Sequence, residues 1–361
     1  MKRKLTAILL ALVLVVSLAS CAGDAADTDN TPDENIANDA DSGDDAREPA
    51  EPDGEANAKP ALKVGFLKGP TGMGASYLME QNEIGETLCD YDVTVEADVS
   101  NINNAIISGN MDLAAVPTNV ASVLYNKTEG QVQIVAVNTL GVLYILENTA
   151  SVEAENGMVN IVSDLAGKTV YATGQGANPQ YVLEYVLSEN GLTVGEDVQV
   201  EYLVADELAT KMAAGEVSLC MLPVPNATAV MLQNANVRKA LSLAEEWESV
   251  TGGDSVLTQG CIVARKDAVS DEALESFLTD YETSINYMKD ETNIDDAAAL
   301  AVKYGIVAAE GIAKAAIPEC NMIFLTGADA MRETLAGYYE VLFSADPTSI
   351  GGSVPDDAFY R

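Results

Sequence analysis

The stretch that decides the fold is LKVGFLKGPTGMGAS, from Leu62 to Ser76. Its first half is an apolar run typical of a buried strand, and its second half is broken by glycine and proline before a helical pattern resumes at Tyr77. A strand, a glycine loop and a helix start in this order indicate an α/β unit. Such a turn presents backbone N–H groups and the positive end of a helix dipole at one edge of a parallel sheet, so we expect a ligand loop here. The alternative is that the glycines only permit a tight connection.

The rest of the chain alternates in the same way. Further runs typical of strands are Val93–Glu96, Leu113–Val116, Ile134–Val137, Val142–Leu146, Val170–Ala172, Val198–Leu203, Leu219–Leu222 and Cys261–Ala264. Helical patterns between them include Asn101–Ser108, Thr118–Leu124, Tyr181–Leu187 and Glu207–Ala213. This alternation predicts an α/β fold with mostly parallel sheets. After Arg265 we expect only helices, at Asp271–Lys289, Asp296–Tyr304 and Ala328–Phe343.

An internal repeat divides this core into two similar lobes. Three pairs of landmarks are each 106 positions apart: Val64 and Val170, Gly109 and Gly215, Pro117 and Pro223. One shared offset predicts two α/β lobes of ordinary domain size. The alternative is coincidence in a glycine-rich chain.

The chain leaves the first lobe along LGVLYILEN, at 140–148, and returns along LTQGCIVAR, at 257–265. We therefore expect residues 61–146 and 257–361 to form lobe one and residues 147–256 to form lobe two. Two crossing strands would join the lobes, a geometry suited to closing on a ligand.

The first residues of the chain have the pattern of a targeting signal. Lys2, Arg3 and Lys4 precede an apolar run, which ends in the sequence LASC at Cys21. This resembles a bacterial lipoprotein signal, residues 1–21, which implies cleavage before Cys21 and a lipid on its sulfur. A transmembrane anchor is the weaker alternative, because a bilayer span needs roughly 20 apolar residues.

Residues 22–60 contain thirteen Asp and Glu but only two basic residues and hardly a large apolar side chain. They bury too little apolar surface to fold, so we expect a disordered acidic tether.

Composition excludes several classes of function. From residue 61 onward the chain contains 14 basic and 43 acidic residues. This excess of negative charge makes nucleic acid an unsuitable partner. The chain contains no histidine, so Ser-His-Asp and Cys-His catalysis and His-based metal sites are excluded. No CxxC pair is present, and we interpret Cys89, Cys220, Cys261 and Cys320 as structural residues. Cys220 and Cys261 lie in apolar runs, which favours buried free thiols, while oxidation to disulfides in an exported protein is the alternative. We expect no cofactor and no metal.

Loops at the carboxyl ends of parallel strands are where ligands bind in open α/β sheets. The candidate ligand-binding residues of lobe one are Lys68, Thr71, Gly72, Met73, Thr118, Asn119, Asn138 and Thr139. Those of lobe two are Gly174, Gln175, Gly176, Asn178, Pro225 and Asn226. The alternative for several of the polar residues is an ordinary helix N-cap. Helix N-termini and Lys68 favour one anionic group, and Met73, Tyr77, Tyr144 and Pro225 are candidates to line an apolar body.

These segments resemble a known family. The matching stretches are the LASC lipobox, LKVGFLKGPTG, SGNMDLAAVPTN, DLAGKTVYATGQGANPQYVLEYVLSENGL and GCIVARKDAV. They look like substrate-binding lipoproteins of ABC importers with the type II periplasmic-binding fold, in the NMT1/THI5-like branch that includes sulfonate, nitrate and taurine binding proteins. The resemblance covers residues 61–339 and is most specific at Asp164–Ala172 and Gly109–Ala114. The histidine on which the pyrimidine-synthase relatives rely is missing.

The resemblance implies a protein that does no chemistry. It would capture a small ligand between its lobes at the candidate residues above and deliver it to a membrane permease. We expect a monomer held by lipid to the outer face of the cell membrane. A sensor lipoprotein that presents its ligand to a membrane receptor is the alternative, and a lyase or hydrolase on the same fold is a third possibility without a visible nucleophile and base.

Two expectations concern single residues. Replacing Gly72 with Val should reduce ligand affinity far more than stability, if backbone approaches the ligand there. Trp247 in AEEWESV is either a lid of the cleft or a surface anchor of lobe two, and the sequence does not choose between them.

Overall fold

A computed structural model describes residues 59–151 and 157–361 of the chain. The predicted signal, its Cys21 and all but the last two residues of the predicted tether lie outside the described residues. Among the described helices, none combines the length and the apolar character needed to cross a bilayer.

The strands of the described residues form two mixed sheets. The first sheet has six strands in the order β11-β4-β10-β3-β1-β2, and the second has five in the order β7-β6-β8-β5-β9. The first contains β1 (Ala61–Leu67), β2 (Asp90–Glu96), β3 (Leu113–Pro117), β4 (Val132–Leu140), β10 (Thr258–Arg265) and β11 (Met322–Leu325). The second contains β5 (Leu143–Asn148), β6 (Thr169–Ala172), β7 (Gln199–Tyr202), β8 (Leu219–Pro223) and β9 (Val237–Ser242). We call each sheet with its helices a lobe, and the six-stranded one is the first lobe.

Corresponding strands take the same places in the two sheets. In the first sheet β1 pairs in parallel with β2 and β3, and β10 is antiparallel to β3 and β4. In the second, β6 pairs in parallel with β7 and β8, and β5 is antiparallel to β8 and β9. Each sheet receives its antiparallel central strand from a crossing between the lobes. The predicted fold class is therefore confirmed: two α/β lobes with mixed sheets flanked by helices, joined by two crossing strands.

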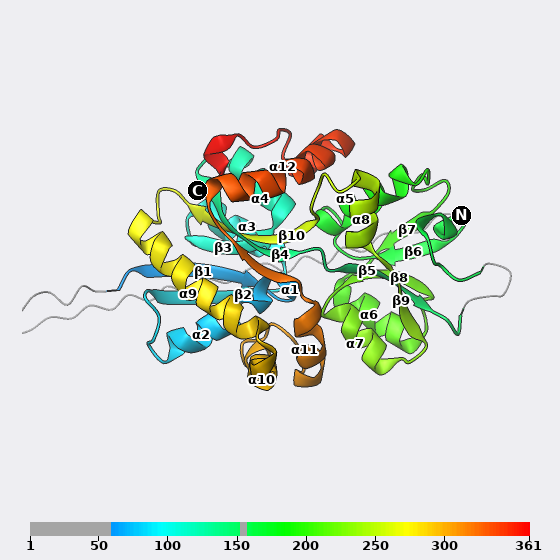
Figure 1. The fold of residues 1–361 in the computed structure, drawn as a ribbon, viewed down its shortest axis with the longest axis horizontal. Coiled ribbons are helices and arrows are strands. Elements are labelled where there is room, and N and C mark those ends of the chain that lie inside the picture. The colour runs from blue at the N-terminus through cyan, green and yellow to red at the C-terminus, as the bar shows by residue number, and fades with distance from the viewer. Residues whose placement is uncertain (1–58, 152–156) are drawn as a thin grey trace, which may run out of the picture. The chain divides into compact units, whose positions relative to one another are not determined.

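Helices cover both faces of each sheet (Figure 1). In the first lobe α3 (Val99–Ser108), α4 (Thr118–Lys127) and α12 (Ala328–Ala345) lie on one face, and α2 (Ser76–Glu83), α9 (Asp271–Lys289) and α10 (Ile294–Lys303) lie on the other. In the second lobe α5 (Asn178–Glu189) and α8 (Leu243–Thr251) lie opposite α6 (Ala205–Ala214) and α7 (Asn226–Gln233). The short elements are α1 (Pro70–Met73), α11 (Glu310–Ala316) and the 3₁₀ turns η1 (Val162–Leu165), η2 (Glu291–Asn293), η3 (Ile317–Glu319), η4 (Pro347–Ile350) and η5 (Asp357–Phe359).

The repeat at an offset of 106 residues is confirmed, because its landmarks take equivalent structural positions. Val64 and Val170 lie in β1 and β6. Gly109 and Gly215 end α3 and α6, and both have a φ of 77°, a left-handed conformation that glycine adopts without strain. Pro117 and Pro223 are the last residues of β3 and β8.

The local structure differs from the sequence-based expectations in three places. The region after Arg265 is not purely helical, because Met322–Leu325 forms β11 at the edge of the first sheet. Val237–Ser242 forms the unexpected edge strand β9 of the second sheet. The glycine loop after β1 contains the short helix α1, in which Pro70 occupies the first position, where its missing N–H costs nothing.

Trp247 is neither a lid nor a surface anchor. Its side chain is fully buried and packs between Tyr185 of α5 and Tyr338 of α12, with ring centroids 5.1 and 6.0 Å away. Its indole Nε1–H donates a 3.0 Å hydrogen bond to Ser255 Oγ, just before β10. The residue is core at the junction of the lobes, where an apolar cluster continues from α5 and α8 onto α12.

The cysteines of the described residues are free and buried, as predicted for Cys220 and Cys261. Burial raises the pKa of the Cys220 thiol to about 12. It also raises the pKa of the Cys320 thiol to about 12, with a smaller contribution from neighbouring Glu319. Thiols that stay protonated at neutral pH are poor nucleophiles, so these residues serve packing.

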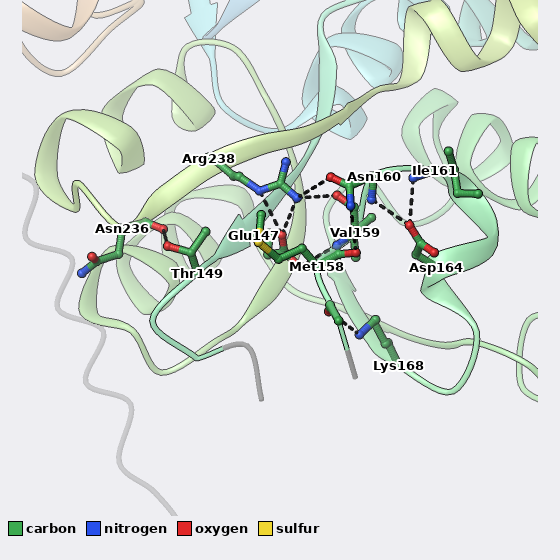
Figure 2. Close-up of polar contacts among 11 residues, drawn as sticks. Glu147, Thr149, Met158, Val159, Asn160, Ile161, Asp164, Lys168, Asn236 and Arg238 are labelled. Carbon is green, nitrogen blue, oxygen red and sulfur yellow. Dashed lines mark hydrogen bonds and ion pairs between the residues drawn. The ribbon is translucent and has the colours of Figure 1, made fainter. Parts of the chain in front are cut away.

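Figure 2 shows the surroundings of Glu147, the only charged side chain of the described residues that is buried. Its carboxylate accepts from Arg238 Nη2 at 2.7 Å, from Arg238 Nε at 3.0 Å and from the Val159 N–H at 3.0 Å. Glu147 pairs with Leu219, the first residue of β8, so it lies at the amino ends of the parallel strands. This carboxylate stabilises the second lobe at the amino ends of its parallel strands and lies away from the candidate ligand loops.

Candidate functional site

Helices begin at the carboxyl edges of both sheets, where ligand loops are expected. α4 starts directly after β3, with Thr118 as its first residue, and α5 starts with Asn178 after β6. α7 starts with Asn226 after β8. The N-cap positions are Pro117, Ala177 and Pro225, and no side chain caps these three helices. The interpretation of Thr118, Asn178 and Asn226 as ordinary N-caps is therefore wrong, and their side chains make other contacts.

Three candidate residues of the first lobe lie together around Asn138. The Asn138 Nδ2 group donates to Thr71 O at 2.9 Å and to Tyr281 Oη at 2.8 Å, and the Thr139 hydroxyl donates to Asn138 Oδ1 at 3.0 Å. All four side chains are buried. A Cβ at Gly260 of β10 would lie 2.3 Å from Thr71 Cγ2, so glycine is needed there for this close approach.

A second buried polar cluster joins the two lobes at Asn178, whose side chain is fully buried. Tyr338 of α12 donates its hydroxyl to Asn178 Oδ1 at 2.8 Å. Asn178 Nδ2 in turn donates to the Thr258 carbonyl at 2.9 Å. Thr258 begins β10, so one amide of the second lobe bridges the second crossing strand and the C-terminal helix of the first lobe.

Thr118 and Asn119 extend this cluster within the first lobe. The Tyr339 hydroxyl donates to Thr118 O at 2.8 Å, and Asn119 Nδ2 donates to Ser349 O at 3.0 Å. Three side-chain oxygens in the cluster remain buried without a hydrogen-bond partner among the described residues: Thr118 Oγ1, Asn119 Oδ1 and Thr258 Oγ1. A buried polar atom without a partner costs about 1–3 kcal/mol, so such atoms indicate where a ligand or an ordered water would bind.

The electrostatics of this region come from helix ends and not from charged side chains. α4 and α5 have 10 and 12 residues, and their N-termini meet the cluster with partial positive charge. Burial raises the pKa of the Tyr338 and Tyr339 hydroxyls well above the ordinary range, which keeps both neutral. Lys68 is exposed at the end of β1, and no contact of its ammonium group with another described residue is present.

The lobes also face each other at Gly69 and Pro225, which directly precede α1 and α7. A Cβ placed on Gly69, which has a φ of 92°, would lie 4.0 Å from Pro225 Cδ of the second lobe. Gly72 has a different role. A Cβ there would lie 2.0 Å from the Leu67 carbonyl oxygen, which belongs to the backbone and has little freedom to move. The expectation that Gly72→Val would spare stability is therefore wrong, because this glycine is required by the turn from β1 into α1.

The remaining candidates are not gathered with these clusters. Gln175 and Gly176 are exposed, and the Gly176 N–H donates to Gln180 Oε1 of its own lobe at 2.7 Å. Gly174 has a φ of 79° and packs against Pro179. Asn226 is half-buried and donates to Asp206 Oδ1 at 3.0 Å.

The four residues proposed for an apolar ligand body are also dispersed. Met73 is fully buried in the core of the first lobe, and Tyr77 stacks on Tyr287 with centroids 3.8 Å apart. Tyr144 lies under the Lys239 ammonium group, 4.0 Å from its ring centroid. Pro225 lies against the facing lobe, and Tyr144 packs against apolar residues of both lobes.

Sequence reasoning missed Thr258, Tyr281 and Tyr338. Thr258 stands in TQG at the start of the return strand, a polar triplet before an apolar run, and this signal could have found it. The two tyrosines lie within amphipathic helices, where nothing in the pattern separates them from core residues. Within 59–151 and 157–361, no group of three or more His, Cys, Asp or Glu side chains is placed to hold a metal ion.

The family model described as NMT1/THI5 like matches residues 89–293, more than half of the chain. The chain belongs to the NMT1/THI5-like family. No curated protein sequence matches it. Solved structures similar to this NMT1/THI5-like protein include an ABC transporter protein from Parabacteroides distasonis, at 18% identity and a TM-score of 0.68, covering 84% of this chain and 99% of that one.

Two further structures carry more specific names. The periplasmic aliphatic sulphonate binding protein SsuA from Escherichia coli has 16% identity and a TM-score of 0.61, covering 83% of this chain and 93% of its own. The periplasmic nitrate-binding protein NrtA from Synechocystis PCC 6803 has 13% identity and a TM-score of 0.54, covering 75% of each chain. At these identities the likeness establishes the fold, which is the type II periplasmic-binding fold.

Proposed function

We propose that this NMT1/THI5-like protein is an extracytoplasmic solute-binding lipoprotein. It captures a small anionic ligand between its two lobes, without changing it chemically, and delivers it to the permease of an ABC importer. The observation that carries the proposal is the buried polar cluster of Thr118, Asn119, Asn178 and Thr258, to which both lobes contribute and in which three oxygens have no partner among the described residues. A ligand bound there would contact both lobes and would favour the closed arrangement.

Local dipoles support an anionic group on the ligand. The protein carries a net charge of −37, so an anion must be held against the overall field. The N-termini of α4 and α5 offer backbone N–H groups without competing side-chain caps, and hydroxyls of Thr118 and Thr258 add donors. Lys68, exposed at the end of β1, adds positive charge at the carboxyl edge of the first sheet. Proteins of the same fold are named for binding sulphonates and nitrate, which are anions.

Transport without catalysis agrees with the chemistry of the chain. Histidine is absent, and the one buried carboxylate of the described residues, Glu147, is engaged by Arg238 at the opposite edge of the second sheet. Membrane attachment through lipid on Cys21 follows from the LASC signal and would keep the protein beside its permease. The protein acts as a monomer in this proposal.

The experiment is a thermal-unfolding screen of the protein with nitrate, sulfate, phosphate, methanesulfonate, taurine and small carboxylates. A ligand at 100 times its Kd stabilises the native state by about 2.7 kcal/mol, which raises the Tm by several degrees. At least one anion should give a shift that grows with its concentration. The absence of any shift across the screen would contradict the proposal.

A matched pair of variants at the two ends of α4 tests whether the ligand binds at Thr118. Thr118→Val removes an unpartnered buried hydroxyl and should weaken the binding of the anion found in the screen by about tenfold or more. Thr128→Val, at the other end of the helix, loses local bonds to Leu124 O and the Val132 N–H. It should lower stability and leave the affinity unchanged. Equal affinities in both variants would place the ligand elsewhere.

A further inference from the structure

A polar contact between the lobes lies on the side of the molecule where α7 faces α11. Glu319 ends η3 in the first lobe, and its carboxylate accepts hydrogen bonds from two groups of the second lobe. Lys239 Nζ of β9 lies 2.8 Å from Glu319 Oε1, and Thr228 Oγ1 of α7 lies 3.0 Å from Glu319 Oε2. The same ammonium group lies over the Tyr144 ring. We call Tyr144, Thr228, Lys239 and Glu319 the Glu319 cluster.

The Glu319 cluster is too polar and too exposed to fix the two lobes rigidly to each other. The Lys239 and Glu319 side chains are 25% and 36% exposed, so water and salt reach them. A second inter-lobe contact, around Trp247 and Tyr338, is fully buried and combines aromatic packing with a neutral hydrogen bond from Tyr338 to Asn178. Packed aromatic surface resists separation, whereas a hydrated ion pair exchanges readily with water. Lobe separation would therefore start at the Glu319 cluster and reach the buried side around Trp247 and Asn178 last.

We propose that Glu319 is a positioning residue that holds the second lobe against the first before any ligand arrives, and that Lys239 and Thr228 are the groups it holds. An ion pair of this exposure, together with a cation resting on an aromatic ring, shifts the closed–open equilibrium by up to about tenfold. The protein then rests in a mostly closed state that opens on the α7 side.

A protein that is closed before its ligand arrives differs in ligand affinity and in the rate of ligand entry. Each contact that stabilises the closed state without ligand raises the affinity of a ligand that requires closure, in proportion to the fraction of closed molecules. It also slows entry, because the ligand enters through the open form. This second part rests on the proposed function, whereas the closure itself does not.

The test measures the distance between the lobes without ligand. Spin labels carried by unnatural amino acids at the exposed positions Glu310 of α11 and Gln233 of α7 leave all cysteines untouched. Glu319→Gln keeps the shape of the side chain and removes its charge, and Lys239→Met keeps an aliphatic stem over Tyr144. Both variants should lower the ratio of closed to open molecules by about threefold to tenfold and shift the distance distribution to longer distances. Raising the salt concentration from 50 to 500 mM should do the same to the unsubstituted protein and little to Glu319→Gln.

The control is Lys303→Met, which removes an ion pair within the first lobe, between Lys303 and Glu83 at 2.8 Å. It should leave the distance distribution unchanged. If Glu319→Gln and Lys239→Met, both shown to be folded by their thermal unfolding, give the same distances as the unsubstituted protein, the proposal is overturned. It is equally overturned if the unsubstituted protein already shows only long distances.

Adding nitrate or methanesulfonate at 10 mM separates this inference from the proposed function. If the variants open without ligand but neither anion closes them again, Glu319 positions the lobes while the proposed anion is wrong. If an anion closes all variants and Glu319→Gln shows the same resting distances as the unsubstituted protein, the proposed function stands and the role of Glu319 is refuted.

Discussion

Two of the regions in which the lobes touch have opposite character. Around Asn178 and Trp247 the contact is buried, aromatic and held by neutral hydrogen bonds, such as the one between Tyr338 Oη and Asn178 Oδ1 at 2.8 Å. At Glu319 the contact is partly exposed and depends on one ion pair to Lys239. Both regions lie beside the same crossing strands. The difference assigns them different roles, since buried contacts that are costly to break suit a pivot and a hydrated ion pair suits an opening edge.

The largest expected effect comes from removing the aromatic centre of the pivot. Trp247→Ala should lower the free energy of unfolding by about 3–5 kcal/mol, because a fully buried indole between Tyr185 and Tyr338 leaves a large cavity. Urea unfolding followed by circular dichroism measures this. Trp247→Phe, which keeps a ring but loses the hydrogen bond to Ser255, should cost less than half as much. A loss below about 1 kcal/mol for Trp247→Ala would show that the pivot is not packed as described.

A smaller effect is expected from the polar part of the pivot. Asn178→Ala leaves the Tyr338 hydroxyl and the Thr258 carbonyl without their partner, which should cost about 2–3 kcal/mol of unfolding free energy. Asn226→Ala is the matched control, because Asn226 also opens a helix of the second lobe but is half-buried and bonds only Asp206. Its cost should stay below about 1 kcal/mol. Equal costs for the two variants would remove the distinction between the pivot and the rest of the carboxyl edge.

The smallest change in stability is expected at the opening edge. Thr228→Val keeps the volume of the side chain and removes one of the two donors to Glu319, so the free energy of unfolding should change by less than about 1 kcal/mol. The distance between the lobes should nevertheless increase, which separates positioning from stability. Thr210→Val on α6, whose hydroxyl bonds only Asp206 O within its own helix, should change neither quantity. A loss of stability from Thr228→Val as large as that from Asn178→Ala would mean that both regions are structural joints.

Much of the fold could be predicted from the sequence because the same α/β pattern occurs twice in it. The 106-residue offset relates α3 to α6 and β3 to β8, and the apolar runs of the buried strands are unmistakable. Two edge strands were missed for physical reasons. β9 carries Arg238 and Lys239 in place of an apolar alternation, and β11 has only four residues between helical segments.

The candidate site was predicted in outline but not in its contacts. The helix starts at Thr118 and Asn178 were identified because loops at strand ends are visible in the pattern. Tyr339 is 221 positions from its partner Thr118 and Tyr338 is 160 positions from its partner Asn178, and no local pattern reveals such pairs. The Glu319 cluster joins residues 80 and 91 positions apart, so it too emerges only from the folded chain. Gly72 was misassigned because the sequence shows a glycine but not the carbonyl of Leu67 beside it.

The most direct test of capture between the lobes is amide hydrogen exchange with and without the anion that gives the largest thermal shift. The account predicts slower exchange in both helix starts at once, around Thr118 in the first lobe and around Asn178 in the second, with the distant edge near Glu147 unchanged beyond the effect of global stabilisation. Protection confined to one lobe, or centred away from these helix starts, would contradict a ligand held between the two.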